Sequence, residues 1–202
     1  MTQVLKIHPD NPQLRLIRLA VDKLKSGGVI VYPTDSAYAL GCQIGDKSAM
    51  DRIRKLRNLD ENHNFTLMCK DLSELGIYAR VDNSVFRFLK ANTPGAFTFI
   101  LQATQEVPKR LQHPKRKTIG LRVPDHLVTM QLLEELGEPM MSVTLMMPGT
   151  EQPLNDVDEI IEKLDGKVDL IVESGSCDID PTTIIDLTSG NPEIIRQGKG
   201  QL

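Results

Sequence analysis

Residues 28–41 read GVIVYPTDSAYALG. The segment begins with an uninterrupted apolar run, residues 29–32, which is typical of a strand buried on both faces. Pro33 cannot continue the hydrogen-bond ladder of a central strand, so we expect the strand to end there. The loop that follows carries the hydroxyl of Thr34 and the carboxylate of Asp35. These side chains either cap a turn or face a ligand beyond the strand end, and the segment by itself leaves both open.

Helical and extended segments alternate on both sides of this strand. The predicted helices span residues 12–25, 48–56, 84–90, 126–136 and 156–164, and the predicted strands span residues 29–32, 65–69, 97–103, 118–123, 141–145, 168–172, 183–187 and 193–196. Leu16, Leu19, Ala20 and Leu24 are expected on the inner face of the first helix. The regular alternation predicts an α/β fold with a mixed sheet. The last two strands are joined by a short turn sequence and should pair antiparallel.

Composition limits the class of protein. The chain has 202 residues, of which 40% are hydrophobic, so it can bury the core of one large domain. No apolar run approaches the ~20 residues of a membrane-spanning helix, and residues 1–10 lack a signal pattern. Three well-separated cysteines indicate reduced thiols and a cytoplasmic location rather than a disulfide framework. The four histidines show no metal-ligand spacing, so we expect no structural metal.

Charge is unevenly distributed along a chain whose net charge is −3. Residues 109–122 contain six basic side chains and no acid, whereas residues 151–186 contain eleven acids and two lysines. The basic stretch indicates either a localised anion site or a solvated loop opposite an acidic face. The charge pattern does not choose between them.

Lys55 and Arg57 stand two residues apart at the end of a predicted helix. Both side chains suit phosphate oxygens, because cations form charge-assisted hydrogen bonds with them. On a helix such residues point to nearly opposite sides, whereas in an extended chain they share a face. If both hold one ligand, the helix must unwind near Leu56. Alternatively, they only pair favourably with the helix C-terminus.

Ser142 and Thr144 lie in a predicted strand, where alternation places both on one face, opposite Met141 and Val143. Such a row of hydroxyls suits a pocket wall, and it is also normal for a half-exposed strand. Further polar side chains stand at the ends of other predicted strands: Arg122, Thr182 and Arg196.

Taken in order, these segments resemble the motifs of the YrdC/YciO family. Residues 28–41 resemble its YPTET-x-YGLG opening, 55–57 its KxR element, 94–98 its PGPxT turn, 120–124 its RxP strand, 142–144 its SxN element, 181–186 its STVVD segment and 196–198 its RxG ending. The resemblance covers residues 11–200 and is most detailed for the bacterial YciO branch. It implies one domain over residues 1–202, with a twisted, open, mixed parallel and antiparallel sheet, flanking helices and a concave cationic cavity.

The resemblance also implies chemistry. The YrdC branch makes threonylcarbamoyl-adenylate and pyrophosphate from L-threonine, bicarbonate and ATP, the first step of a tRNA modification. Carried over by motif, the nucleotide would be held by Lys55, Arg57, Asn64, Thr118, Thr144 and Arg196, with Lys55 and Arg57 catalytic. Threonine would be held by Thr34, Arg122, Ser142 and Thr182, with Arg122 pairing its carboxylate. Mg²⁺ is expected with ATP, and no metal ligand is assigned.

Several positions depart from the family pattern. Thr144 stands where the catalytic branch has Asn, and Cys69 falls near a position where a His often helps to hold threonine. One alternative is therefore an RNA-binding protein that uses the same basic cavity with little catalysis, motivated by the basic residues of 109–122. A further alternative is a binding module without turnover. We expect a monomer or weak dimer without membrane association.

Overall fold

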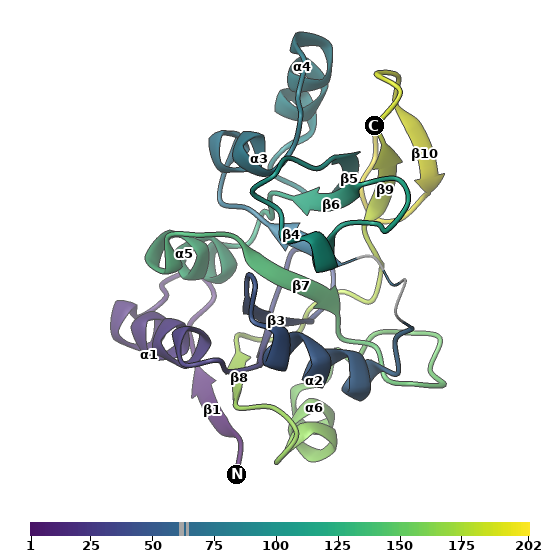
Figure 1. The fold of residues 1–202 in the computed structure, drawn as a ribbon. Coiled ribbons are helices and arrows are strands. Elements are labelled where there is room, and N and C mark those ends of the chain that lie inside the picture. The colour runs from purple at the N-terminus through teal and green to yellow at the C-terminus, as the bar shows by residue number, and fades with distance from the viewer. Residues whose placement is uncertain (61–62, 64) are drawn as a thin grey trace.

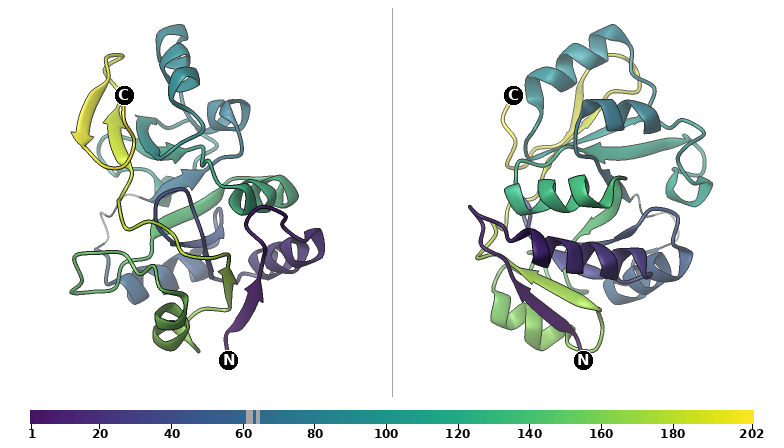
Figure 2. Two further views of the ribbon diagram at one scale, coloured as in Figure 1. Left: turned by 180° about the vertical axis from the view of Figure 1, so that it is seen from behind. Right: turned by 90° about the vertical axis from the view of Figure 1, so that its left-hand side faces the viewer.

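The computed structural model describes residues 1–60, 63 and 65–202. One mixed sheet runs through these residues with helices on both of its faces (Figures 1 and 2). Its strands are β1 (Gln3–Lys6), β2 (Ile30–Tyr32), β3 (Ala39–Gln43), β4 (Thr66–Met68), β5 (Phe97–Gln102), β6 (Thr118–Arg122), β7 (Met140–Thr144), β8 (Leu170–Glu173), β9 (Thr183–Asp186) and β10 (Glu193–Arg196). The helices are α1 (Leu14–Lys25), α2 (Lys47–Arg57), α3 (Leu72–Tyr78), α4 (Asn83–Asn92), α5 (Leu127–Leu136) and α6 (Val157–Leu164), with a 3₁₀ turn over Lys109–Leu111.

The strand order is β1-β8-β2-β3-β7-β4-β6-β5-β9-β10. Four pairs are parallel (β1–β8, β2–β8, β4–β6 and β5–β9), and the other pairs are antiparallel. The predicted mixed α/β sheet and the antiparallel pairing of the last two strands are both confirmed. The two ends of the chain lie beside the two edge strands, at opposite ends of the molecule (Figure 1).

In residues 28–41, the first strand agrees with the prediction, whereas a second strand was not predicted. β2 is fully buried and ends at Tyr32, directly before Pro33. The chain then returns as β3, antiparallel to β2, which sequence reasoning missed. Ala and Gly have little preference for strands, so this segment carries no strand signal. Gly41 is required by packing, because a Cβ there would lie 2.8 Å from the sulfur of Met140.

Other predicted features needed correction. β1 and α3 were not predicted, because each is short and has too few periodic apolar residues to be recognised. In α1 the buried residues are Ile17, Ala20, Val21 and Leu24, spaced as one helical stripe. The predicted inner face was therefore wrong at Leu19, which is 40% exposed.

Two apolar clusters cover the two faces of the sheet. On one face α1 and α5 lie side by side over Ile30, Ala39 and Met140 (Figure 2). The other cluster contains buried residues of α2, α3, α4 and α6 together with alternate strand residues such as Leu40 and Met141. The core is mainly aliphatic, and Tyr32, Tyr38, Phe65 and Phe99 are fully buried within it.

The α1 and α5 pair covers only part of its face. The strand positions that follow on the same side are polar: Thr66, Thr98, Arg122, Ser142 and Thr144. The sheet therefore presents a row of hydroxyls and a guanidinium in a region that none of the described helices covers. This uncovered region positions the site described next.

No helix in the described ranges is long and apolar enough to cross a membrane. All three cysteines are free thiols. Burial raises the pKa of Cys42 to about 12 and that of the Cys69 thiol well above its usual range, so both stay protonated near neutral pH.

Candidate functional site

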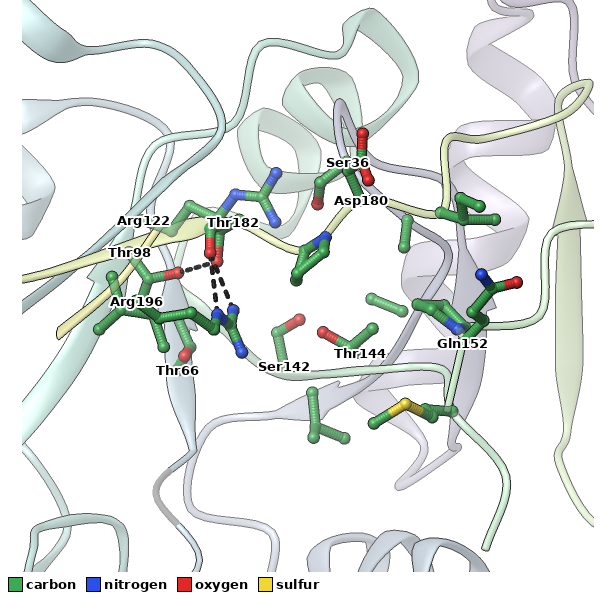
Figure 3. A pocket seen from close by; sticks show the side chains of 18 of the residues that line it. Ser36, Thr66, Thr98, Arg122, Ser142, Thr144, Gln152, Asp180, Thr182 and Arg196 are labelled. Atoms are coloured by element: carbon green, nitrogen blue, oxygen red, sulfur yellow. Dashed lines mark hydrogen bonds between the residues drawn. The ribbon is translucent and has the colours of Figure 1, made fainter. Parts of the chain in front are cut away.

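A cavity of about 500 Å³ opens on the uncovered part of the sheet (Figure 3). Six hydroxyl side chains line it: Ser36, Thr66, Thr98, Ser142, Thr144 and Thr182. Three guanidinium groups join them from separate segments: Arg57, Arg122 and Arg196. The cavity therefore combines cations with hydroxyl donors, which suits a ligand rich in anionic oxygen.

The predicted alternation in β7 is confirmed. Ser142 and Thr144 both line the cavity, whereas Met141 and Val143 belong to the core cluster of the opposite face. Val143 also borders the cavity. Ser142 is held in place by the hydroxyl of Tyr32 at 2.5 Å. Burial raises the pKa of that phenol, so it remains a neutral hydrogen-bonding group.

In the loop after β2, some polar side chains stabilise the turn and others line the cavity. Thr34 donates to the carbonyl of Ala37 at 2.6 Å and accepts from the N–H of Ser36 at 3.1 Å. This is the turn-capping alternative, and Thr34 does not line the cavity. Ser36 lines it instead. Asp35 forms an ion pair with Arg122, which ends β6 and reaches the cavity as predicted.

The helix that carries the KxR element directs its two cations, Lys55 and Arg57, to different surroundings. α2 continues without unwinding to its last residue, Arg57, and is capped by Asn58 in the left-handed conformation. Arg57 is buried, lines the cavity and donates to the carbonyl of Met146. Burial lowers the pKa of Arg57, although a guanidinium remains charged at neutral pH. Lys55 is exposed and lies outside the cavity lining, so the structure does not bring the two cations together.

The C-terminal motifs meet in one hydrogen-bonded group (Figure 3). Arg196 donates from Nε and Nη2 to the carbonyl of Thr182, at 3.2 and 2.9 Å. The hydroxyl of Thr182 lies 2.8 Å from that of Thr98. Sequence reasoning placed Thr182 and Arg196 at a site and missed Thr98, although Thr98 ends the quoted 94–98 motif. Burial lowers the pKa of Arg196 as well.

One further predicted position, Thr118, does not reach the cavity. Thr118 starts β6, roughly 13 Å along the strand from Arg122 at ~3.3 Å per residue, and is absent from the lining. Asn64 lies outside the described residues. Sequence reasoning missed His63, Glu151, Gln152 and Asp180, which line the cavity from irregular loops that carry no motif.

The sequence assigned no metal ligand. In the described ranges, no three His, Cys, Asp or Glu side chains gather as they would around a metal ion. Asp186 accepts from the N–H and hydroxyl of Thr188, at 2.9 and 2.6 Å, and pairs with Arg116. Its strand-end position is therefore explained by turn capping.

The sheet order, the polar cavity and the motif order together define an α/β protein with a cavity lined by hydroxyl and guanidinium groups. A family model described as "Telomere recombination", for Sua5, YciO and YrdC, matches residues 22–198. The chain belongs to the Sua5/YciO/YrdC family, which confirms the resemblance seen in the sequence.

Within this family the chain is similar to the uncharacterized protein YciO of Escherichia coli (strain K12). The two are 56% identical over 202 residues, covering 100% of this chain and 98% of YciO. The crystal structure of E. coli YciO superimposes with a TM-score of 0.96 over 100% of this chain and 98% of that one, at 57% identity. P. abyssi Sua5, in a crystal structure complexed with L-threonine, shares the fold with a TM-score of 0.89, at 22% identity over 98% of this chain and 58% of that one.

Proposed function

We propose that the cavity binds ATP and L-threonine and catalyses the formation of threonylcarbamoyl-adenylate from L-threonine, bicarbonate and ATP, with release of pyrophosphate. The observation that carries this proposal is the convergence of Arg57, Arg122 and Arg196 on one hydroxyl-lined cavity. These cations come from α2, β6 and β10, so only the folded chain assembles them.

The amino acid fits the part of the cavity around Arg122. A guanidinium matches a carboxylate in a fork geometry, and Ser142 and Thr182 provide hydroxyls in the same lining. The L-threonine complex of P. abyssi Sua5, a protein with the same fold, supports a small amino acid as the ligand.

The phosphates fit the part of the cavity that contains Arg57, Thr144 and Arg196. In the proposed reaction, the threonine amine and bicarbonate lose water to give a carbamate. A carbamate oxygen then bonds to the α-phosphorus, and the bond from that phosphorus to the bridging oxygen breaks as pyrophosphate leaves. Such a step depends mainly on positioning and on stabilisation of phosphate charge, which guanidinium groups supply. Mg²⁺ would enter with the triphosphate of ATP and neutralise part of its charge.

The decisive measurement is pyrophosphate release from ATP in the presence of L-threonine and bicarbonate. The proposal expects release that requires both compounds and falls at least tenfold in Arg122→Lys, which keeps the charge but loses the fork. Arg80→Lys is the matched control, because Arg80 is exposed and does not line the cavity. Release that is independent of threonine, or no release although ATP binds, would overturn the proposal.

RNA binding is a second candidate, and a specific observation favours it. Lys109, Arg110, Lys115, Arg116 and Lys117 are all exposed on the loop between β5 and β6. Of these five, only Arg116 forms an ion pair among the described residues. The loop adjoins the start of β6, at the opposite end from Arg122, so RNA would use this surface rather than the cavity.

Neutralisation of phosphates predicts that affinity for RNA falls steeply with salt. Replacing Lys109, Arg110 and Lys115 by Gln should then reduce both the affinity and its salt dependence. Replacing the exposed Lys25, Lys47 and Lys90 by Gln gives a control of equal charge change. Binding that is insensitive to salt, or equally weakened by both triple variants, would exclude this surface.

A further inference from the structure

A buried ion pair lies at the edge of the cavity. Arg122 donates from Nη2 to Oδ1 of Asp35, and the two side chains are only 7% and 10% exposed. Asp35 belongs to the loop after β2, whereas Arg122 ends β6. A contact between such distant segments fixes the guanidinium relative to both.

Both carboxylate oxygens of Asp35 are engaged. Oδ1 accepts from Arg122, and Oδ2 accepts from the backbone N–H of Asp125 at 3.0 Å. The backbone of Asp35 is fastened as well, because Nζ of Lys199 donates to its carbonyl at 2.8 Å. Lys199 also pairs with Asp178 at 3.1 Å. The carboxylate is therefore held from several sides, and its position is built into the fold.

Arg122, by contrast, is only partly engaged. A guanidinium has five N–H donors in a planar fork, and Asp35 occupies one of its ends. Within the part of the chain that the structure describes, Nε of Arg122 is buried and has no hydrogen-bond partner. A buried donor without a partner is costly, so its presence on a cavity-lining residue points to a ligand acceptor.

We propose that Asp35 is a positioning residue: it holds one end of the Arg122 guanidinium and thereby presents the Nε edge to a carboxylate of the ligand. This inference rests on the proposed function in one respect, since the ligand carboxylate would be that of the amino-acid substrate. Asp35 itself would not touch the ligand; it would act by orienting Arg122.

The contrary interpretation is that Asp35 competes with the ligand carboxylate and must leave before the ligand binds. The geometry argues against this. Displacing Asp35 would break its bonds with Arg122 and with the Asp125 N–H, whereas among the described residues Nε of Arg122 has no hydrogen-bond partner that a ligand would have to replace. The two interpretations predict opposite effects of removing the Asp35 charge. Loss of a positioning residue weakens carboxylate binding, whereas loss of a competitor strengthens it.

The experiment uses ¹⁵N-labelled full-length protein and follows the Nε–H resonance of Arg122, identified by its loss in Arg122→Lys. Acetate, the simplest carboxylate probe, is titrated at constant ionic strength into the wild type, Asp35→Asn and Asp125→Asn. Asp125→Asn is the matched control, because it removes a charge from the same region while Asp35 contacts only the backbone of Asp125. ATP affinity is measured for all three proteins.

We expect acetate to shift the Arg122 resonance in the wild type and in Asp125→Asn. In Asp35→Asn we expect acetate affinity to fall at least tenfold while ATP affinity changes less than twofold, a separation that general damage to the fold would not give. Equal or tighter acetate binding by Asp35→Asn, or no response of the resonance in the wild type, would overturn the inference.

A second variant keeps the test informative if Asp35→Asn fails to fold. Asp35→Glu retains the charge but lengthens the side chain by one methylene, so it should displace the guanidinium and weaken acetate binding several-fold. Unchanged acetate binding in Asp35→Glu would contradict a positioning role. If acetate responds as expected but the wild type does not bind L-threonine, the inference stands and the proposed function fails.

Discussion

Arg57→Ala and Lys55→Ala, compared in one assay, test how the KxR element works. Residues two apart on an α-helix are separated by ~200° around its axis. In the structure this separation leaves Arg57 8% exposed in the cavity wall and Lys55 exposed outside it. A ligand in the cavity should therefore depend on one of the two cations and not on the other.

The expected magnitudes follow from burial. Removing a preorganised donor that stabilises developing charge costs about 2.7–4 kcal/mol, so Arg57→Ala should reduce pyrophosphate release about 10²- to 10³-fold. An exposed cation contributes about 0–1 kcal/mol, because water and salt screen it, so Lys55→Ala should reduce the rate at most about fivefold. The two variants remove the same formal charge from the same helix, which makes each the control for the other.

The assay measures steady-state pyrophosphate release, and the ATP dissociation constant where turnover is slow. Thermal unfolding of each variant shows whether the fold is kept, which matters because Arg57 also donates to the carbonyl of Met146. Arg57→Lys, which retains the charge, should recover part of the loss. An equal loss in Lys55→Ala and Arg57→Ala would refute the reasoning, and it would mean that the last turn of α2 unwinds when the ligand binds.

Four further predictions concern substitution and pH. Thr144→Asn should raise pyrophosphate release about three- to tenfold, because an amide both donates and accepts hydrogen bonds and one bond is worth about 0.5–1.5 kcal/mol; an unchanged rate would contradict a nucleotide contact at this position. Gly198→Ala should lower the free energy of unfolding in urea by about 1–3 kcal/mol, because its Cβ would lie 2.2 Å from the carbonyl oxygen of Pro181. Gly76→Ala in α3, where a Cβ meets nothing within 4 Å, should instead stabilise by about 0.5–1 kcal/mol. Burial acts to raise the pKa of Asp186, but hydrogen bonds from Thr188 and Arg116 outweigh it and hold that pKa below its usual range. Asp186→Asn should therefore be less stable than the wild type at pH 7, and the difference should shrink as the pH falls below about 4; a difference independent of pH would show that Asp186 does not act through its charge.

Local sequence signals predicted much of the fold. The apolar run at residues 29–32 and the following Pro33 determined where a buried strand ends. The period of two in β7 placed Ser142 and Thr144 on one face. By contrast, β3 was missed because Ala39 and Gly41 carry no strand signal. Gly41 is required by close packing against Met140 and Tyr32, which no local pattern reveals.

Local motifs also predicted some residues that line the cavity and others that do not. The motifs identified Arg57, Arg122, Ser142, Thr144, Thr182 and Arg196, all of which line the cavity. They also pointed to Lys55, Thr34 and Thr118, which do not. A motif records that residues occur together along the chain, but it does not say which way each side chain points.

The sequence by itself determined the family, the strand periodicity and six of the residues that line the cavity, because these depend on the order and spacing of side chains. Only the tertiary structure decided that α2 remains helical through Arg57, that Thr34 caps a turn while Ser36 faces the cavity, and that Asp35 pairs with Arg122. The physical reason is that these outcomes depend on contacts between distant segments. The Asp35–Arg122 pair joins residues 87 positions apart, and its geometry exists only after folding has brought the loop that follows β2 to the end of β6.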